Sequence, residues 1–112
     1  MVRWLPDLAW LLFTGFFLLS SHPIKAQEEG RVERGRVLVQ TRCEQCHAAG
    51  LTGASPVRAA PPLRDLHKRY PVAQLEEAFG EGGVPGHPAM PPIPLDPAQI
   101  ADLIAYLKTF ER

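Results

Sequence analysis

The apolar residues of this sequence recur mostly at the three- and four-residue spacing of helices. Over 28–41, Val32, Gly35, Leu38 and Val39 lie near one face of such a helix. The remaining positions mix Arg with Glu, a pattern typical of a solvated face. No segment sustains the period-two alternation of a half-buried strand, and no internal repeat is visible. The pattern therefore predicts an all-α fold.

Two shorter helices are predicted in the middle of the chain. Leu63, Leu66 and Tyr70 form one short helical stretch. The next helix begins at Pro71, which suits a first helical turn, and ends at the glycine-rich segment 80–83. Its apolar face consists of Val72, Leu75 and Phe79.

The start of the C-terminal helix has the clearest local signals in the sequence. Asp96 can cap the helix, Pro97 suits its first position and Gln99 completes a capping box. Leu95 is placed to pack on Ile100 as a hydrophobic staple. The buried face of this helix consists of Ile100, Leu103, Ile104, Leu107 and Phe110.

Loops rich in Pro and Gly separate the helices at 48–62 and 84–94. The prolines of the second loop are too many for a helix or a central strand and stiffen an extended chain. Met90 lies in the middle of this loop.

The N-terminus has the pattern of an export signal. A basic residue precedes an apolar run from Leu8 to Leu19, and Ile24-Lys25-Ala26 offers a cleavage site before Gln27. An uncleaved anchor is the alternative, but the run is well short of the roughly 20 residues that span a bilayer. We therefore expect a signal peptide over 1–26 and one domain over 27–112, with no membrane span in the mature chain.

Composition narrows the classes of function. Lys plus Arg and Asp plus Glu both number 12, so no global charge draws the protein to nucleic acid or to an anionic membrane. A mature chain of about 86 residues buries a modest share of its surface, and chains this small often need a disulfide, a metal or a cofactor to be stable.

The string Cys43-Glu44-Gln45-Cys46-His47 fits the C-x-x-C-H pattern of c-type haem attachment. Two thiols on one helical turn can each add to a vinyl group of the haem, and the adjacent imidazole then lies beneath the iron. A disulfide or a thioredoxin-like redox pair would use the cysteines alone, but that redox motif belongs to a βαβ context. A zinc site would need His67 or His87 as a further ligand, without the usual paired spacing.

Met90 is the candidate for the second axial ligand of the iron. Apart from the initiator it is the only methionine, and a methionine between prolines on a loop is a poor choice for core packing. A thioether is one of the axial ligands that haem proteins use. His87, three residues earlier, is the alternative ligand, whereas His67 lies in a polar string and is expected at the surface.

These residues resemble the class I monohaem cytochromes c, including the small bacterial periplasmic members. The resemblance covers nearly all of the mature chain and rests on Gly35, Cys43 to His47, Pro61-Pro62-Leu63, Met90-Pro91-Pro92 and 100–107. It implies the cytochrome c fold, with three to four short helices and long loops wrapped around one covalently bound haem c and its iron. It also implies haem attachment outside the cytoplasm, in agreement with the export signal.

The resemblance also implies roles for individual residues. Gly35 would let the first helix cross closely against the last, near Tyr106. The carbonyl of Pro62 would receive the ring N–H of His47, and Met90 would close the opposite face of the haem. The mature chain has no Trp beside the haem propionates, so their partners are not assigned. The candidates are Arg58, Arg64 and Tyr70.

The expected function is that of a monomeric one-electron carrier in the periplasm, acting between donor and acceptor redox proteins. Ligation by His47 and Met90 leaves no open position on the iron, so the protein is expected not to be an enzyme. Two alternatives remain. One is a site that binds a gas or a peroxide after Met90 detaches, and the other is the cytochrome subunit of a larger dehydrogenase or oxidase complex.

Overall fold

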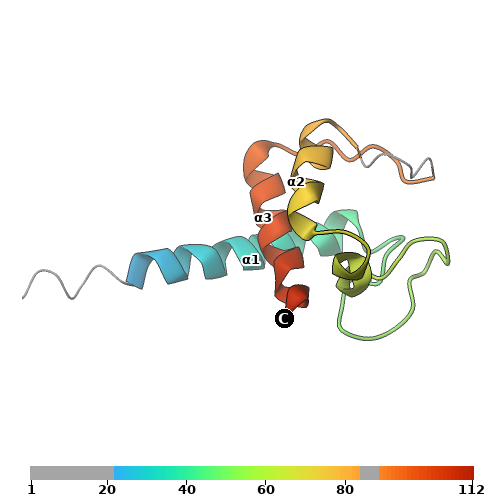
Figure 1. The fold of residues 1–112 in the computed structure, drawn as a ribbon, viewed down its shortest axis with the longest axis horizontal. Helices are drawn as coiled ribbons and strands as arrows, with labels where there is room; N and C mark the ends of the chain where they lie inside the picture. The colour runs from blue at the N-terminus through green and yellow to red at the C-terminus, as the bar shows by residue number, and fades with distance from the viewer. Residues whose placement is uncertain (1–21, 84–88) are drawn as a thin grey trace, which may run out of the picture.

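Helices make up the regular structure of the protein in the computed structural model, which describes residues 22–83 and 89–112 (Figure 1). In chain order they are the α-helix α1 (His22–Arg42), the 3-10 helix η2 (Leu63–Lys68), α2 (Val72–Gly80), α3 (Pro97–Lys108) and the 3-10 helix η3 (Thr109–Glu111). The described residues contain no strand, which confirms the predicted all-α fold. The predicted loop between α1 and η2 is also present.

The first helix begins earlier than predicted, at His22 rather than at residue 28. The prediction placed Ile24-Lys25-Ala26 in the signal peptide, and the structure includes these residues in α1. Residues 23–29 are exposed, and this end of α1 projects away from the other helices (Figure 1).

Most of the expected signal peptide, residues 1–21, lies outside the described residues. Within the part of the chain that the structure describes, no helix is both long enough and apolar enough to cross a membrane.

The backbones of α1 and α3 meet at Gly35. A Cβ at this position would lie 2.0 Å from the carbonyl oxygen of Asp102 and 2.8 Å from the Cβ of Tyr106. No side chain fits such a gap, so the role expected of Gly35 is confirmed. Beside this contact, Arg34 donates from Nε and Nη2 to the two carboxylate oxygens of Asp102, at 2.9 and 3.0 Å. This forked ion pair joins the two helices where they cross.

The predicted start of α3 is confirmed. The Asp96 carboxylate accepts a hydrogen bond from the backbone N–H of Gln99 at 2.8 Å, and the Gln99 side chain accepts one from the N–H of Asp96 at 3.0 Å. Pro97 occupies the first helical position. The bounds of α2 lie within one residue of the prediction, because the helix begins at Val72 rather than at Pro71 and includes Gly80 as its last residue.

One apolar core lies where α1, η2, α2 and α3 meet. Val39 of α1 is 0 % exposed and Val72 of α2 is 1 % exposed. The other buried members are Leu63, Leu66, Leu75, Ile100, Leu103, Ile104 and Leu107. Several of these leucines also border a space beside the C-terminal end of α1, which is the candidate functional site.

Candidate functional site

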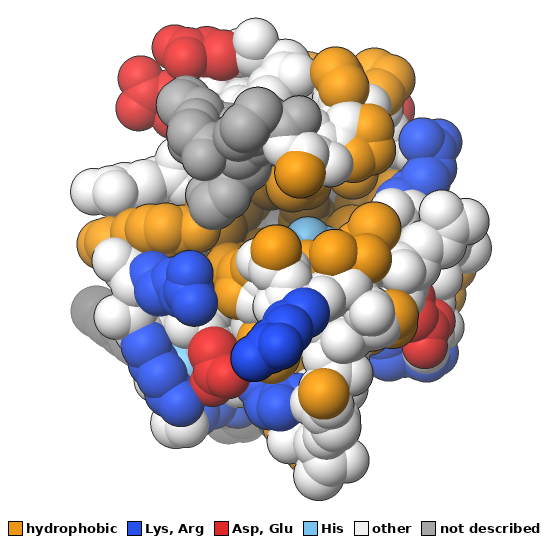
Figure 2. Space-filling model, turned by 90° about the vertical axis from the view of Figure 1, so that its right-hand side faces the viewer, with side chains coloured by type: hydrophobic (Ala, Val, Ile, Leu, Met, Phe, Trp, Pro, Cys, Tyr) orange, Lys and Arg blue, Asp and Glu red, His pale blue; other side chains and the backbone are white. Residues whose placement is uncertain are grey.

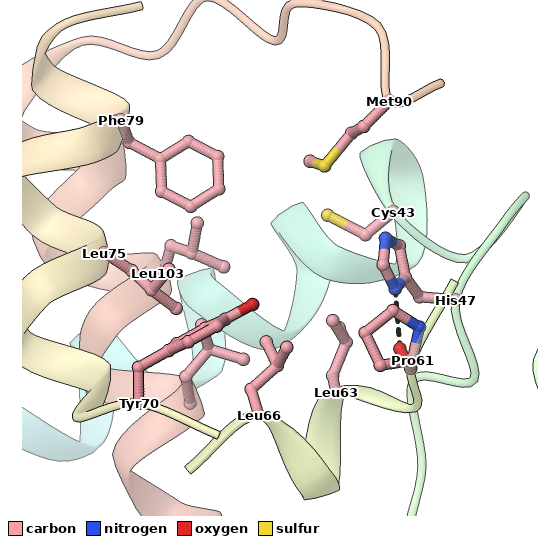
Figure 3. A pocket seen from close by; sticks show the side chains of 11 residues that line it. Cys43, His47, Pro61, Leu63, Leu66, Tyr70, Leu75, Phe79, Met90 and Leu103 are labelled. Carbon is pink, nitrogen blue, oxygen red and sulfur yellow. Dashed lines mark hydrogen bonds between the residues drawn. The ribbon is translucent and has the colours of Figure 1, made fainter. Parts of the chain in front are cut away.

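An apolar crevice opens between the end of α1, η2, α2 and α3 (Figure 3). Its hydrocarbon walls consist of Leu63, Leu66, Leu75, Phe79, Leu103 and Leu107. Cys43, His47, Pro61, Tyr70 and Met90 line the same space. An adjoining hollow of about 230 Å³ continues past Cys46 and shares four of these residues. The two spaces together are called the crevice below.

The C-x-x-C-H string forms a turn that continues α1 to the edge of the crevice. The N–H of Cys43 donates to the carbonyl of Val39 at 2.9 Å, and the N–H of His47 donates to the carbonyl of Cys43 at 2.9 Å. Both cysteines are half-buried free thiols on this turn. Burial raises the pKa of the Cys43 thiol, an effect that the positive charge of Arg42 partly opposes, so this thiol is protonated at neutral pH.

The His47 imidazole has one nitrogen tied to the backbone and the other directed into the crevice (Figure 3). Its Nδ1 lies 2.7 Å from the carbonyl oxygen of Pro61. Because a carbonyl oxygen can only accept a hydrogen bond, Nδ1 is the donor, and Nε2 is the ring nitrogen left for a metal ion. A neutral imidazole in this tautomer is a ready ligand for a metal ion.

The prediction that Pro62 receives this hydrogen bond is wrong, since the acceptor is Pro61. The Pro62 carbonyl instead accepts the N–H of Asp65 at 3.0 Å, the bond that begins η2. Both prolines lack an N–H, and nothing in their spacing separates them. The signal that could have distinguished them is the start of the helical stretch at Leu63, which occupies the carbonyl of the residue just before it.

Met90 enters the crevice from the proline-rich loop. Its side chain lies across the crevice from the wall formed by η2, in the same space as the His47 ring (Figure 3). His87, the alternative ligand, lies outside the described residues. His67 was expected at the surface but is half-buried on η2, and its buried Nδ1 has no hydrogen-bond partner among the described residues. It does not line the crevice.

The structure does not support a thioredoxin-like redox pair or a zinc site at Cys43 and Cys46. The described residues contain no strand, so a thioredoxin-like βαβ context is not found there. In the same part of the chain, no three His, Cys, Asp or Glu side chains are close enough to share a metal ion, so His67 does not complete a zinc site with Cys43 and Cys46.

The residues of the crevice fit a haem. Its walls are hydrocarbon, as the flat apolar macrocycle requires, and an imidazole and a thioether enter the same space. Of the three candidate partners of the propionates, only Tyr70 lines the crevice (Figure 3). Arg64 binds two loop carbonyls instead, and Arg58 is exposed and lines neither hollow.

An all-α chain with a C-x-x-C-H turn at the edge of an apolar crevice defines a haem protein of the c type. The family model for cytochrome c matches residues 32–111, which include the turn, the crevice walls and Met90. The chain therefore belongs to the cytochrome c family, and its size is consistent with a class I member that carries one haem. Neither the curated proteins nor the solved structures give a significant match.

Membership of this family has direct consequences for chemistry. The protein binds covalent haem c with its iron, and the spacing of Cys43 and Cys46 fits that attachment. The family acts in haem-based electron transfer between redox proteins.

Proposed function

We propose that the protein is a periplasmic one-electron carrier, attached to its haem through Cys43 and Cys46 and ligating the iron with His47 and Met90. The observation that carries this proposal is that these four side chains line one crevice. The His47 imidazole and the Met90 thioether enter the same apolar space, beside two free thiols.

Each of these side chains has a distinct task. The bound haem supplies iron that cycles between two oxidation states. His47 presents Nε2, while the bond from its Nδ1–H to Pro61 fixes the ring and strengthens it as a donor. When haem is bound, ligation by the Met90 thioether would favour the reduced state and leave no position for a substrate. A site of this kind carries an electron and makes no bonds, which favours a carrier over an enzyme.

Donor and acceptor redox proteins could reach the haem at the mouth of the crevice. Figure 2 shows hydrophobic side chains around a hollow in which a histidine is visible, with Lys and Arg side chains gathered below it. The residues that line the hollow beside Cys46 include Val57, Ala59, Ala60, Pro91 and Ile93, which are small or apolar and would permit close approach. We propose that a single copy of the chain meets its partners there.

The exposed start of α1 supports removal of the signal peptide before Gln27. Residues 23–26 are exposed, so loss of this part of α1 uncovers none of the described core. The first turn of α1 as described contains no acidic residue. Cleavage would place Glu28 and Glu29 in the new first turn, where negative charge is favourable near the helix N-terminus. Intact mass of the periplasmic holoprotein tests this step, with the mass of 27–112 plus one haem expected and a full-length mass contradicting it.

Spectroscopy tests the carrier function. The reduced and oxidised holoproteins should both be six-coordinate and low-spin, and an optical redox titration should follow a single one-electron curve. Carbon monoxide should leave the reduced spectrum unchanged. A five-coordinate wild-type spectrum, or ready binding of carbon monoxide, would instead favour a gas- or peroxide-binding function.

A further inference from the structure

The hydrogen bond that orients His47 joins the two arms of one loop. His47 stands at the start of the loop and Pro61 near its end, and their 2.7 Å contact spans the gap between them. The N–H of Leu63 donates to the carbonyl of Ala48 at 3.0 Å and ties the same two arms next to this contact. The orientation of the imidazole therefore depends on how the loop is held against the start of η2.

Arg64 makes a further tie across this loop. Its Nη2 donates to the carbonyl oxygen of Gly53 at 2.7 Å, and its Nη1 donates to that of Gly50 at 3.4 Å. Gly53 has a φ of +89°, a conformation that turns the chain and that other residues rarely adopt. The planar guanidinium has donors on two nitrogens and can bind two acceptors at once.

The other hydrogen bonds of the loop join different segments. Ser55 Oγ accepts the N–H of Ala48 at 3.0 Å, and the N–H of Val57 donates to the carbonyl of Cys46 at 3.2 Å. The first lies within the loop, and the second connects the loop to the C-x-x-C-H turn. Among the hydrogen bonds of the described residues, only those of Arg64 join the bend at 50–53 to η2.

We propose that Arg64 is a positioning residue for His47. By holding the bend at 50–53 against η2, it keeps the Pro61 carbonyl on the Nδ1–H of His47. This bond makes the imidazole a stronger donor, which stabilises oxidised iron and lowers the reduction potential. The inference rests on His47 as an iron ligand, as proposed above, and it explains why Arg64 is not available to a haem propionate.

Two substitutions of Arg64 and one matched control test this role in the holoprotein. Arg64→Met removes the charge and both donors, whereas Arg64→Lys keeps the charge but cannot span both carbonyls. Arg58→Met removes the same charge from an exposed residue of the same loop that makes no side-chain hydrogen bond or ion pair with the described residues. Loss of a positive charge alone lowers a reduction potential, because it makes oxidised iron less costly.

The two effects of Arg64→Met therefore have opposite signs and can be separated. We expect its reduction potential to lie above that of Arg58→Met, and that of Arg64→Lys to lie above that of the wild type. Exchange of the His47 Nδ1 proton with water, followed by NMR, should be about tenfold faster in Arg64→Met and unchanged in Arg58→Met.

Equal potentials in Arg64→Met and Arg58→Met, with unchanged proton exchange, would overturn the proposal. If Arg64→Met does not accumulate as holoprotein, Arg64→Lys decides alone: a raised potential and faster exchange support the role, and wild-type values refute it. A wild-type holoprotein in which His47 is not a ligand would refute the proposed ligation instead, a result that the NMR spectrum of the wild type distinguishes before any variant is compared.

Discussion

Gly35 lies so close to α3 that a Cβ on it would come within 2.0 Å of the carbonyl oxygen of Asp102. This contact sets the distance between α1 and α3, and α1 ends at the turn that carries the haem-attachment motif. Leu103 and Leu107 of α3 form part of the crevice wall. The short distance between α1 and α3 therefore determines where Cys43 and Cys46 lie relative to that wall.

Substitution of Gly35 by Ala should destabilise the holoprotein. The added methyl group would meet backbone atoms, which cannot move aside as the end of a flexible side chain can. Overpacking of this kind costs about 1–3 kcal/mol, and contact with backbone places the expected loss of unfolding free energy at the upper end or beyond. Denaturant unfolding of wild-type and variant holoprotein measures the difference.

Gly30→Ala is the matched control on the same helix. Among the described residues its Cβ would meet only the Arg34 side chain, at 3.2 Å, and Ala is favoured over Gly within a helix by up to about 1 kcal/mol. This variant should be as stable as the wild type or more so. An equal loss in both variants would mean that the loss reflects glycine in α1 generally and not the contact with α3.

Tyr106 should make the stability of the protein sensitive to alkaline pH. Its hydroxyl donates to the carbonyl of Ala49 at 2.9 Å, and burial is the main reason that its pKa is raised above the ordinary value of 10.0. A raised pKa means that the folded state holds this proton more tightly than the unfolded state. The associated stability is complete below the ordinary pKa and is lost as pH rises through the folded-state pKa.

Tyr106→Phe isolates this contribution. At neutral pH the variant should lose about 1 kcal/mol of unfolding free energy, because the Ala49 carbonyl loses its partner. At alkaline pH the difference from the wild type should shrink, as the wild type loses the benefit that the variant never had. Urea unfolding at both pH values measures it, and a difference that does not change with pH would contradict the assignment to the Tyr106 proton.

Local signals explain which features could be predicted from the sequence. The start of α3 was predictable because Asp96, Pro97 and Gln99 act within one helical turn. The attachment motif was predictable because its chemistry depends on the spacing of neighbouring residues. The close crossing at Gly35 came from the family resemblance and not from a local pattern.

Features that depend on the folded loop could not be predicted in the same way. Which of Pro61 and Pro62 binds His47 follows from where η2 begins, a matter of one residue. Arg64 binds the Gly53 carbonyl at a bend where Gly53 has a positive φ, a conformation that the sequence alone does not reveal. The sequence shows only that Arg64 follows the haem motif. The loop geometry shows that its guanidinium binds carbonyl oxygens of the same chain.

Folding of the chain should depend on the haem. The walls of the crevice are leucines and Phe79, which would face water if the macrocycle did not cover them. A covalently attached haem stays with the chain in the unfolded state, so it stabilises the folded state through burial of its apolar surface and ligation of its iron on folding. Replacing both Cys43 and Cys46 by Ala should therefore give a largely unfolded chain by circular dichroism.

The single variant Cys46→Ala serves as the control for that experiment. It keeps Cys43, which lines both parts of the crevice and can still form one thioether bond. We expect it to retain haem and helical structure. A double variant that is helical and unfolds cooperatively without haem would show that the apolar core around Val39 and Val72 is sufficient for folding.

Met90→Ala should open the face of the haem opposite His47. Met90 lines the crevice, and Ala at this position cannot reach the iron with a ligand atom. Loss of a thioether ligand should lower the reduction potential and let carbon monoxide bind the reduced iron readily, while the wild type resists it. Spectral titration with carbon monoxide and potentiometry measure the two effects.

His87→Ala is the comparison that separates the two candidate ligands. If Met90 is the ligand, this substitution should change the potential and the carbon monoxide response much less than Met90→Ala does. If instead His87→Ala is the change that alters ligation, the protein is still a carrier, with two imidazole ligands and a lower potential. If the wild type binds carbon monoxide as fast as Met90→Ala, neither residue closes the site. The half-buried Met90 side chain would then line the crevice without blocking the iron. A gas- or peroxide-binding function would in that case explain the site better than electron transfer.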